Sequence, residues 1–295
     1  MTVNERRSRF VMTNGFRTHY TESGGDGPVV VALHGGGAGS SGAAGMDALM
    51  QRLSPDIRVI AIDSVGGFGL TDVNAPSPHG ILSRAEHVGA VADALCLDRF
   101  VILGNSQGAW AASRYAISNP DRIQSMILIG TSTVAMAMDI KVEKNAAMLA
   151  LQGYDGTREG MRKLLQAIVY DKSIITENLI DLRYAAATRP GAMEAFKTAV
   201  KGNERLRTDP LMRAIFFLGD SLPAFTKSIP TTFIWGENDE FAIPELGRQI
   251  EAKLPDATFE WVAQAGHQVQ NDQPEICAKI VENFVRRTAP VSVDR

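Results

Sequence analysis

Cysteine is scarce in this sequence, with two residues, Cys96 and Cys277, among 295. They do not form the regularly spaced set that frames a small disulfide-stabilised secreted protein. The charged start from Met1 to Arg7 is followed by no apolar signal segment, and no run approaches 18 uncharged apolar residues. These absences argue against a secreted or membrane-spanning protein and predict a cytoplasmic one.

An excess of one charge sign is also missing, because 30 Lys and Arg residues are balanced by 33 Asp and Glu residues. Without a basic run, the sequence predicts no surface for nucleic acid or anionic membranes. No metal-ligand spacing occurs, and the glycines of Gly35–Gly39 lack the register of a dinucleotide fingerprint. We therefore expect a small-molecule substrate, no metal and no bound cofactor.

Short apolar runs, separated by segments of helical spacing, are the main structural signal. Such runs are typical of strands that are buried on both faces of a parallel, helix-covered sheet. With 295 residues and 45% hydrophobic content, the chain can form one large α/β core. The predicted strands are Phe16–Glu22, Val29–Leu33, Val59–Ile62, Phe100–Leu103, Met126–Ile129, Thr231–Trp235 and Thr258–Val262.

The strand-like runs stop for about a third of the chain, and helical spacing replaces them there. We interpret residues 131–225 as a helical cap that is inserted into an α/β core made of residues 1–130 and 226–295. Within the core, Ser83 and Glu86 have the spacing of a capping box at the start of a crossover helix.

A glycine-flanked serine is the strongest local motif. Gly104-Asn-Ser106-Gln-Gly108 directly follows one predicted strand and precedes a segment of helical character. In a G-x-S-x-G turn between strand and helix, the tight bend lifts the serine hydroxyl clear of the sheet. A glycine-rich loop without catalytic function has the same local pattern, so the assignment of Ser106 as a nucleophile depends on partner residues elsewhere.

A serine nucleophile needs a base and a group that orients this base, and in this type of sheet they follow in the order serine, acid, histidine. Asp239 and His267 each follow a predicted strand, so both are expected at the carboxyl edge of the sheet. Glu237 and Glu240 compete with Asp239 for the role of the acid. The sequence predicts the catalytic triad Ser106, Asp239 and His267.

A second glycine-rich loop, His34-Gly-Gly-Gly37, follows the first continuous apolar run. In related motifs the backbone N–H groups of this loop complete an oxyanion hole, and glycine permits the close approach that this requires. The predicted donors are the N–H groups of Gly36 and of Gln107, the residue after the nucleophile. A plain glycine turn is the alternative interpretation.

These motifs together resemble the meta-cleavage product hydrolases, which cleave carbon–carbon bonds in aromatic and steroid ring degradation. The likeness covers nearly the whole chain and includes the glycine loop from His34 to Gly39, the elbow Gly104–Gly108, the loop Asp63–Asp72 and the cap segment Val169–Tyr184. The resemblance implies an α/β-hydrolase fold with a mostly parallel central sheet, flanking helices and an inserted helical cap. Such enzymes are often dimers or larger homo-oligomers.

The resemblance also implies substrate-binding residues. Arg183 matches an arginine that contacts substrate oxygens, and Asn105 matches a hydrogen-bond donor to the substrate; Gly37 and Gln268 are further candidates. From the residues alone, Arg183 lies on an otherwise apolar helical stripe, where a guanidinium needs either an anionic or enolic ligand or a cap carboxylate. Asn105 could equally stabilise the turn.

The implied reaction is hydrolysis of a vinylogous 1,5-diketone that binds as its dienol or dienolate. His267 helps to protonate it, and Ser106, or a water that the triad activates, attacks the carbonyl to give a carboxylate and a 2-hydroxydienoic acid. Gln268 stands where the family usually has tryptophan, and Gly45 where it has asparagine. These departures keep a carboxylesterase, lactonase or amide hydrolase open. Two relatives of this fold whose function is not hydrolysis are further alternatives: dioxygenases that need no cofactor, and hormone receptors that hydrolyse poorly.

Overall fold

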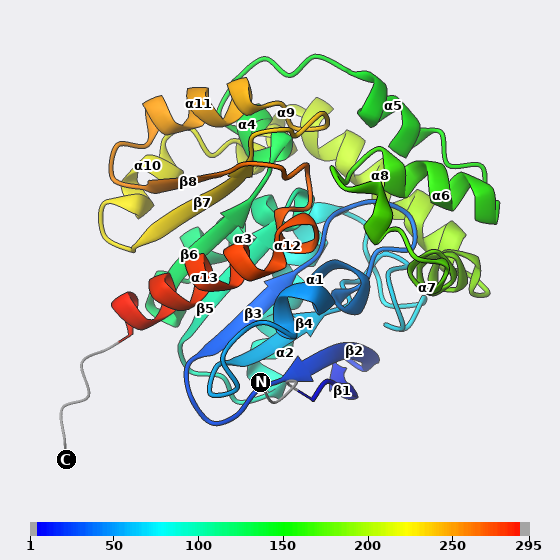
Figure 1. The fold of residues 1–295 in the computed structure, drawn as a ribbon, viewed down its shortest axis with the longest axis horizontal. Helices are drawn as coiled ribbons and strands as arrows, with labels where there is room; N and C mark the ends of the chain where they lie inside the picture. Colours follow the sequence, from blue (N-terminus) through cyan, green and yellow to red (C-terminus); the bar gives the residue numbers. More distant parts are fainter. Residues whose placement is uncertain (1–4, 290–295) are drawn as a thin grey trace.

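An eight-stranded sheet lies at the centre of the computed structural model, which describes residues 5–289 (Figure 1). The strand order is β1-β2-β4-β3-β5-β6-β7-β8, in which β1–β2 and β2–β4 are antiparallel and the other neighbours are parallel. The predicted mostly parallel sheet is confirmed, and all its predicted strands are present. The strands are β1 Arg7–Thr13, β2 Phe16–Ser23, β3 Val29–Leu33, β4 Arg58–Ile62, β5 Phe100–Asn105, β6 Ile123–Ile129, β7 Thr231–Gly236 and β8 Thr258–Val262.

Strand β1 has no counterpart among the predicted strands, because most of its side chains are exposed and show no apolar alternation. It pairs with β2 across a two-residue turn, Asn14-Gly15. Both residues have positive φ, 50° and 83°, as the tight hairpin turns that suit twisted strands require. The Asn-Gly dipeptide is therefore the sequence signal that identifies this edge hairpin.

Helices cover both faces of the sheet, and β5 shows how its side chains are divided between them. Phe100 and Ile102 pack into the core cluster that contains α2 and α3, whereas Val101 and Leu103 pack into the cluster that contains α1 and α13. A continuous apolar run is what a strand covered on both faces requires.

None of the helices within residues 5–289 has the length and apolarity needed to cross a membrane. The helices are α1 Gly42–Met50, α2 Ile81–Ala94, α3 Gln107–Ser118, α4 Ser132–Ala137, α5 Ala146–Gln152, α6 Arg158–Gln166, α7 Glu177–Thr188, α8 Ala192–Thr208, α9 Pro210–Phe216, α10 Ser221–Thr226, α11 Pro244–Lys253, α12 Val269–Asp272 and α13 Pro274–Thr288, with 3₁₀ turns at Pro120–Arg122 and Lys172–Ile174.

The glycine loop and the serine turn come from adjacent strands at the point where the strand order reverses. The chain passes from β3 to β4 on one side, whereas β5 lies on the other side of β3. The carboxyl ends of β3 and β5 therefore flank the crevice in which open α/β sheets bind ligands. Because β6, β7 and β8 continue the parallel arrangement, the loops after them emerge at the same edge.

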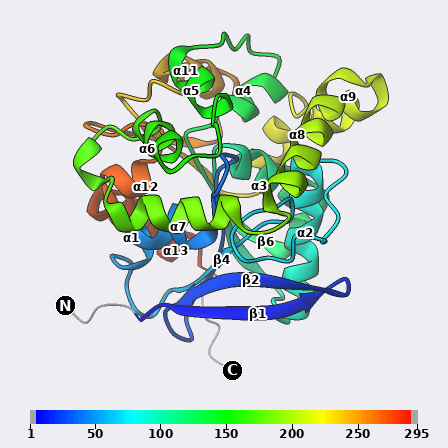
Figure 2. The ribbon, with the colours of Figure 1, turned by 90° about the vertical axis from the view of Figure 1, so that its right-hand side faces the viewer.

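Helices α4–α10 form an insertion between the end of β6 and the start of β7. The first and last of them, α4 and α10, contact the core helix α3, while α7 contacts α1 and α8 contacts α2. Helices α5, α6, α7 and α8 lie together on the right-hand side of Figure 1, the side that faces the viewer in Figure 2. This helical insertion agrees with the cap expected from the sequence.

The predicted capping box at Ser83 is wrong. Helix α2 begins earlier, at Ile81, after Gly80 with a φ of 56°, so Ser83 lies inside the first turn and its hydroxyl accepts the N–H of His79. The Oδ1 atom of Asn203, from α8, accepts the N–H of Ile81 at 2.6 Å instead. A distant side chain thus replaces the local cap, which a local spacing pattern cannot reveal.

Candidate active site

Ser106 lies in a sharp turn between β5 and α3. Its φ of 58° is in the left-handed region, which residues other than glycine rarely adopt and which stores strain. A Cβ atom at Gly104 would lie 2.3 Å from the carbonyl oxygen of Gly108, and one at Gly108 would lie 2.5 Å from those of Leu33 and His34. Both glycines of the motif are therefore required for the close packing of this turn.

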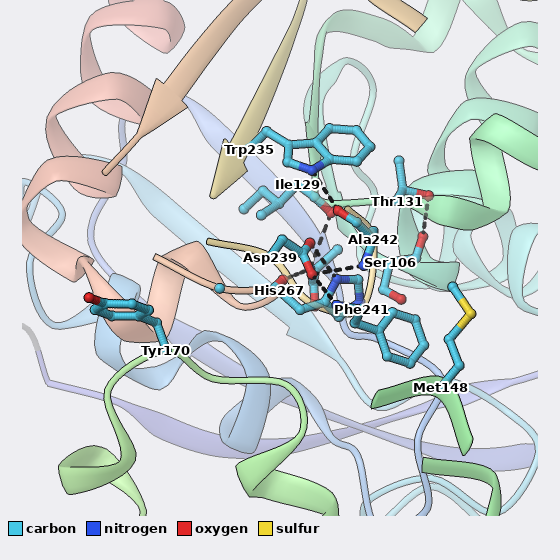
Figure 3. A network of polar contacts seen from close by, with 12 residues as sticks. Ser106, Ile129, Thr131, Met148, Tyr170, Trp235, Asp239, Phe241, Ala242 and His267 are labelled. Atoms are coloured by element: carbon cyan, nitrogen blue, oxygen red, sulfur yellow. Dashed lines mark hydrogen bonds and ion pairs between the residues drawn. The ribbon is translucent and has the colours of Figure 1, made fainter. Parts of the chain in front are cut away.

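Hydrogen bonds to neighbouring elements hold the strained turn in place. The N–H of Ser106 donates to the carbonyl of Ile129 at the end of β6, and its own carbonyl accepts the hydroxyl of Thr131, both at 3.0 Å (Figure 3). Thr131 is also the N-cap of α4, where its Oγ1 accepts the N–H of Val134. The sequence reasoning missed Thr131, although a threonine just before a helix is a common capping signal.

Asp239 and His267 meet at the edge of the sheet, as Figure 3 shows. His267 Nδ1 donates to Asp239 Oδ2 at 2.9 Å. The other carboxylate oxygen accepts the N–H groups of Phe241 and Ala242, each at 2.8 Å. Asp239 is buried, whereas the two neighbouring glutamates that competed with it are exposed. Of the three candidate acids, Asp239 is the one that the structure places against the histidine.

The second ring nitrogen of His267 is available to accept a proton. Because Nδ1 donates to Asp239, Nε2 is the acceptor, and it is buried without a hydrogen-bond partner within residues 5–289. Ser106 Oγ and His267 Nε2 are not hydrogen-bonded to each other, but the two residues line the same cavity. A general base and its nucleophile often reach bonding distance when a substrate is bound, so the arrangement suits base catalysis.

This cavity is narrow, with a volume of about 20 Å³, and lies between the sheet edge and the insertion. The core contributes most of its polar wall, while α5, α7 and the segment after α6 close it from the other side. Its lining residues are Gly35, Gly36, Gly37, Ser40, Asn105, Ser106, Leu151, Ile168, Arg183, Phe241, His267 and Gln268.

The glycine loop is oriented by the ring of His34. His34 Nδ1 donates to the carbonyl of Gly35 at 2.7 Å, and Nε2 accepts the N–H of Ser64 at 3.1 Å, which requires a neutral ring with one defined tautomer. Burial holds the pKa of His34 well below its usual range, which agrees with the neutral form.

The two predicted oxyanion donors lie side by side. A Cβ atom at Gly36 would be 2.1 Å from the side-chain oxygen of Gln107, so this loop packs directly against the serine turn. Within the described part of the chain, the N–H groups of Gly36 and Gln107 donate to no other protein group. Gln107 is also the first residue of α3, and N–H groups at a helix start favour a negative charge.

Arg183 reaches the cavity from α7 of the insertion. Its side chain is 2% exposed, and Nη2 donates to the carbonyl of Ala38 at 3.1 Å and to Ser40 Oγ at 2.9 Å. Nε is buried without a partner, and no carboxylate in residues 5–289 forms an ion pair with the guanidinium. Burial lowers the pKa of Arg183 to about 10, so the group is charged at neutral pH. The salt bridge to a cap carboxylate that the sequence left open is absent from the described residues.

Asn105 uses its donors inside the protein. Both Nδ2 hydrogens are directed at backbone carbonyls, those of Ile129 at 3.2 Å and His267 at 3.1 Å. These bonds join the serine turn to the histidine loop across the end of β6. The contacts favour the turn-stabilising role of Asn105 over the role of a donor to the substrate.

Gly37 and Gln268, the remaining predicted substrate-binding residues, both line the cavity. A Cβ atom at Gly37 would lie 3.1 Å from Arg183 Nη2, so a larger residue there would crowd the guanidinium. The carboxamide oxygen of Gln268 accepts the Nδ2 group of Asn271 at 3.0 Å. Gln268 therefore gives this part of the wall a polar side chain in place of an aromatic ring.

Asp272, which the sequence reasoning did not select, connects the insertion to the histidine loop. Its carboxylate accepts the N–H groups of Tyr170 and Asp171 from the insertion, at 2.9 and 3.1 Å, and that of Gly266 at 2.8 Å. Burial raises the pKa of Asp272, although the three N–H donors oppose this effect. An acid five residues after His267 carries no local signal for this role.

The arrangement supports nucleophilic acyl chemistry on a substrate that carries an anionic group. It combines a buried serine in a strained turn at the sheet edge with a histidine fixed by a buried acid. Within residues 5–289 it adds two N–H donors without a protein partner and a buried cation without a carboxylate partner. Within residues 5–289, no group of three or more His, Cys, Asp or Glu side chains has the geometry to hold a metal ion.

Comparison with protein families gives a match to the family described as alpha/beta hydrolase fold over residues 28–274. The chain is 31% identical over 284 residues to the 2-hydroxy-6-oxo-2,4-heptadienoate hydrolase of Pseudomonas putida, covering 96% of this chain and 98% of that enzyme. It is 29% identical over 280 residues to a 2-hydroxymuconate semialdehyde hydrolase of Pseudomonas putida, covering 94% and 93% of the two chains.

Two solved structures show the same fold. A meta-cleavage product hydrolase from Pseudomonas fluorescens superposes with a TM-score of 0.77 at 28% identity, covering 95% of this chain and 98% of that one. A 2-hydroxy-6-oxo-6-phenylhexa-2,4-dienoate hydrolase from Rhodococcus superposes with a TM-score of 0.79 at 19% identity, covering 96% and 99%. The fold class and the family resemblance expected from the sequence are both confirmed.

Proposed function

We propose, from the premise that this chain belongs to the α/β-hydrolase fold family, that it hydrolyses a carbon–carbon bond in a 2-hydroxy-6-oxo-dienoate produced by aromatic ring fission. The similar enzymes are named for substrates of this class. The observation that carries the proposal is the position of Arg183, a buried cation without a carboxylate partner, in the same cavity as Ser106 and His267.

Substrate binding begins with the anionic end of the dienoate. Arg183 offers a guanidinium whose buried Nε has no acceptor, and a carboxylate or enolate oxygen would satisfy it. Ser40 and Gly37 lie next to the guanidinium and shape this end of the cavity. With the anionic end held there, the ketone of the substrate has to lie toward Ser106 and the loop of Gly36.

The chemical step needs proton transfer before attack. His267, kept in one tautomer by Asp239, relays a proton so that the dienol becomes the keto form with a saturated carbon beside the ketone. Ser106 Oγ, or a water held by the same histidine, then attacks the ketone carbon. The N–H groups of Gly36 and Gln107 stabilise the oxyanion that forms.

Bond cleavage follows from the collapse of this intermediate. The electrons of the carbon–carbon bond move into the conjugated dienolate, which takes up a proton and leaves as a 2-hydroxydienoic acid. If Ser106 is the nucleophile, the remaining acyl group is released by water as a carboxylate. One water is consumed and two acids are formed, so no oxidant or bound cofactor is required.

The test compares a 2-hydroxy-6-oxohexa-2,4-dienoate with a p-nitrophenyl acyl ester. We expect loss of the dienolate absorbance with kcat/KM far above that for the ester, together with stoichiometric formation of both acids by chromatography. The alternative of an esterase or lactonase has support in Gln268, which makes the cavity wall polar. Ester turnover with an inert dienoate would overturn the proposal and favour that alternative.

A further inference from the structure

A second buried guanidinium, that of Arg84 in α2, lies behind the glycine loop. Its side chain is 2% exposed, and no carboxylate within residues 5–289 forms an ion pair with it. Arg84 does not line the cavity, whereas Gly35, Gly36 and Gly37 do, so the loop separates Arg84 from the site of reaction. A buried, unpaired cation is costly, and its contacts show what compensates for that cost.

Those contacts are backbone carbonyls of the loop. Arg84 Nη2 donates to the carbonyl of His34, and Nη1 approaches the carbonyl of Gly35 at 3.5 Å. The guanidinium carbon also lies 5.0 Å from the centre of the Phe68 ring, which favours a cation. Burial lowers the pKa of Arg84 to about 9, which leaves it charged at neutral pH.

The direction of these carbonyls fixes the direction of the adjoining N–H groups. In a trans peptide the C=O and N–H bonds point to opposite sides. Because the Gly35 carbonyl is directed at Arg84 and at the ring of His34, the N–H of Gly36 points the other way, away from Arg84. Gly36 itself lines the cavity. A Cβ atom at Gly35 would lie 3.5 Å from Ser106 Cβ, so this side of the loop faces the nucleophile.

We propose that Arg84 is a positioning residue for the reaction: it holds the His34 and Gly35 carbonyls away from the cavity and polarises the peptide that presents the Gly36 N–H to the oxyanion. A cation at the carbonyl end of a peptide strengthens the donor at its other end, since linked hydrogen bonds polarise one another. The inference rests on the proposed use of Ser106 and the glycine loop in catalysis. It assigns a role to an arginine that contacts neither substrate nor nucleophile.

The experiment compares Arg84→Met, Arg84→Lys and the unaltered protein. Arg189→Met is the control, because Arg189, which is partly buried, also donates to a backbone carbonyl, that of Thr71, but not to the glycine loop. Loss of an oxyanion donor commonly costs about 100- to 1000-fold in kcat. We expect Arg84→Met to lower kcat for the dienoate about 10- to 100-fold with KM changed less than about threefold, because its donor is misaligned rather than removed. Arg84→Lys should recover part of the loss.

A second readout separates this inference from the choice of substrate. A p-nitrophenyl alkylphosphonate reacts with an activated serine: Ser106 Oγ bonds to phosphorus, p-nitrophenolate leaves, His267 takes the serine proton, and the phosphoryl oxygen occupies the oxyanion position. The second-order inactivation rate should fall in Arg84→Met by about the same factor as kcat, and this holds even if the dienoate is not the substrate. Thermal unfolding of each variant reports folding independently.

Three outcomes would overturn the proposal. The first is a folded Arg84→Met protein with unchanged kcat and inactivation rate. The second is a loss in Arg189→Met as large as that in Arg84→Met, which would indicate general loosening of the fold. The third is failure of the phosphonate to label Ser106 in the unaltered protein, which would show that Ser106 is not an activated nucleophile. Turnover of the dienoate by the same protein would leave the proposed function standing.

Discussion

The core side and the cap side of the cavity present different polar groups to it. On the core side, Ser106, Asp239 and Asn105 are each fixed by hydrogen bonds to backbone groups at the ends of strands. The buried Nε2 of His267, also on the core side, has no partner within residues 5–289. On the cap side, the charged Arg183 keeps its buried Nε without a partner in the same part of the chain. The unsatisfied group is thus a ring nitrogen on the core side and a cation on the cap side. We infer that the core determines the rate of bond cleavage and the cap determines which substrates bind.

The largest expected effect is on the core side, with Ser106→Ala. Removal of the proposed nucleophile should lower kcat by about 10³-fold or more, because the residues of a catalytic triad act as a unit. Binding of the dienoate, followed by its absorbance, should change less than about threefold, since the cap side is intact. Ser113→Ala is the control, because Ser113 is a buried serine in α3, the helix that follows Ser106, and its hydroxyl donates to the carbonyl of Ala109. A comparable loss of substrate binding in Ser106→Ala would break the division between the two sides.

The next effect is that of Asp239→Asn. The amide keeps the shape of the carboxylate but places an NH₂ group against His267 Nδ1, which favours the wrong tautomer of the ring. We expect kcat to fall by about 10² to 10⁴-fold with little change in KM, measured by steady-state kinetics. Glu237→Gln, an exposed acid in the same loop, should leave kcat unchanged. Equal effects of the two substitutions would show that Asp239 has no special role.

The smallest effect is expected at Asp272, which joins the two sides. In Asp272→Asn an NH₂ group would face backbone N–H donors, so the free energy of unfolding should fall by about 1–3 kcal/mol, and kcat by less than tenfold. Denaturant unfolding and kinetics would measure these changes. A loss of kcat as large as that of Asp239→Asn would mean that the cap contact, and not the core alone, positions His267.

We also expect the contribution of Asp272 to the stability of the folded protein to depend on pH. Burial raises its pKa in the folded state, so the folded protein binds this proton more tightly than the unfolded chain does. The free energy of unfolding that Asp272 contributes should therefore decline as pH rises from the ordinary aspartate pKa of about 3.9 through the higher folded value. The difference in the free energy of unfolding between the unaltered protein and Asp272→Asn, measured across this pH range, should decline as the pH rises. A difference that stays constant with pH would contradict this prediction.

The core side of the cavity could be predicted from the sequence more fully than the long-range contacts that support it. Buried strands and the serine turn have local signals, namely apolar runs and glycines at fixed spacing, so their positions are predicted to within a few residues. The same holds for Arg183, whose place on an apolar helical stripe indicates burial. The sequence predicted Asp239 as the acid, with Glu237 and Glu240 as competitors. The burial of Asp239 and its contact with His267 are long-range properties that only the fold shows.

Arg84 was not predicted from the sequence, although it has a recognisable sequence pattern. It shares a buried helical face with Ile81, Ala85 and Val88, which is the pattern that identified Arg183. The start of this helix, where the sequence predicts a capping box at Ser83, is held instead by Asn203 from another helix. An arginine on an apolar helical face thus indicates a buried guanidinium in a core helix as well as in the cap.

The most direct test of the division between core and cap uses the free acid and the methyl ester of the same 2-hydroxy-6-oxohexa-2,4-dienoate. A hydrogen bond to a charged group contributes about 1.5–3 kcal/mol, so the unaltered protein should prefer the acid by roughly 10- to 100-fold in kcat/KM. In Arg183→Met this preference should disappear with ester turnover unchanged, while Arg158→Met, at an exposed arginine of the insertion, should keep it. A preference for the acid that persists in Arg183→Met would contradict the account.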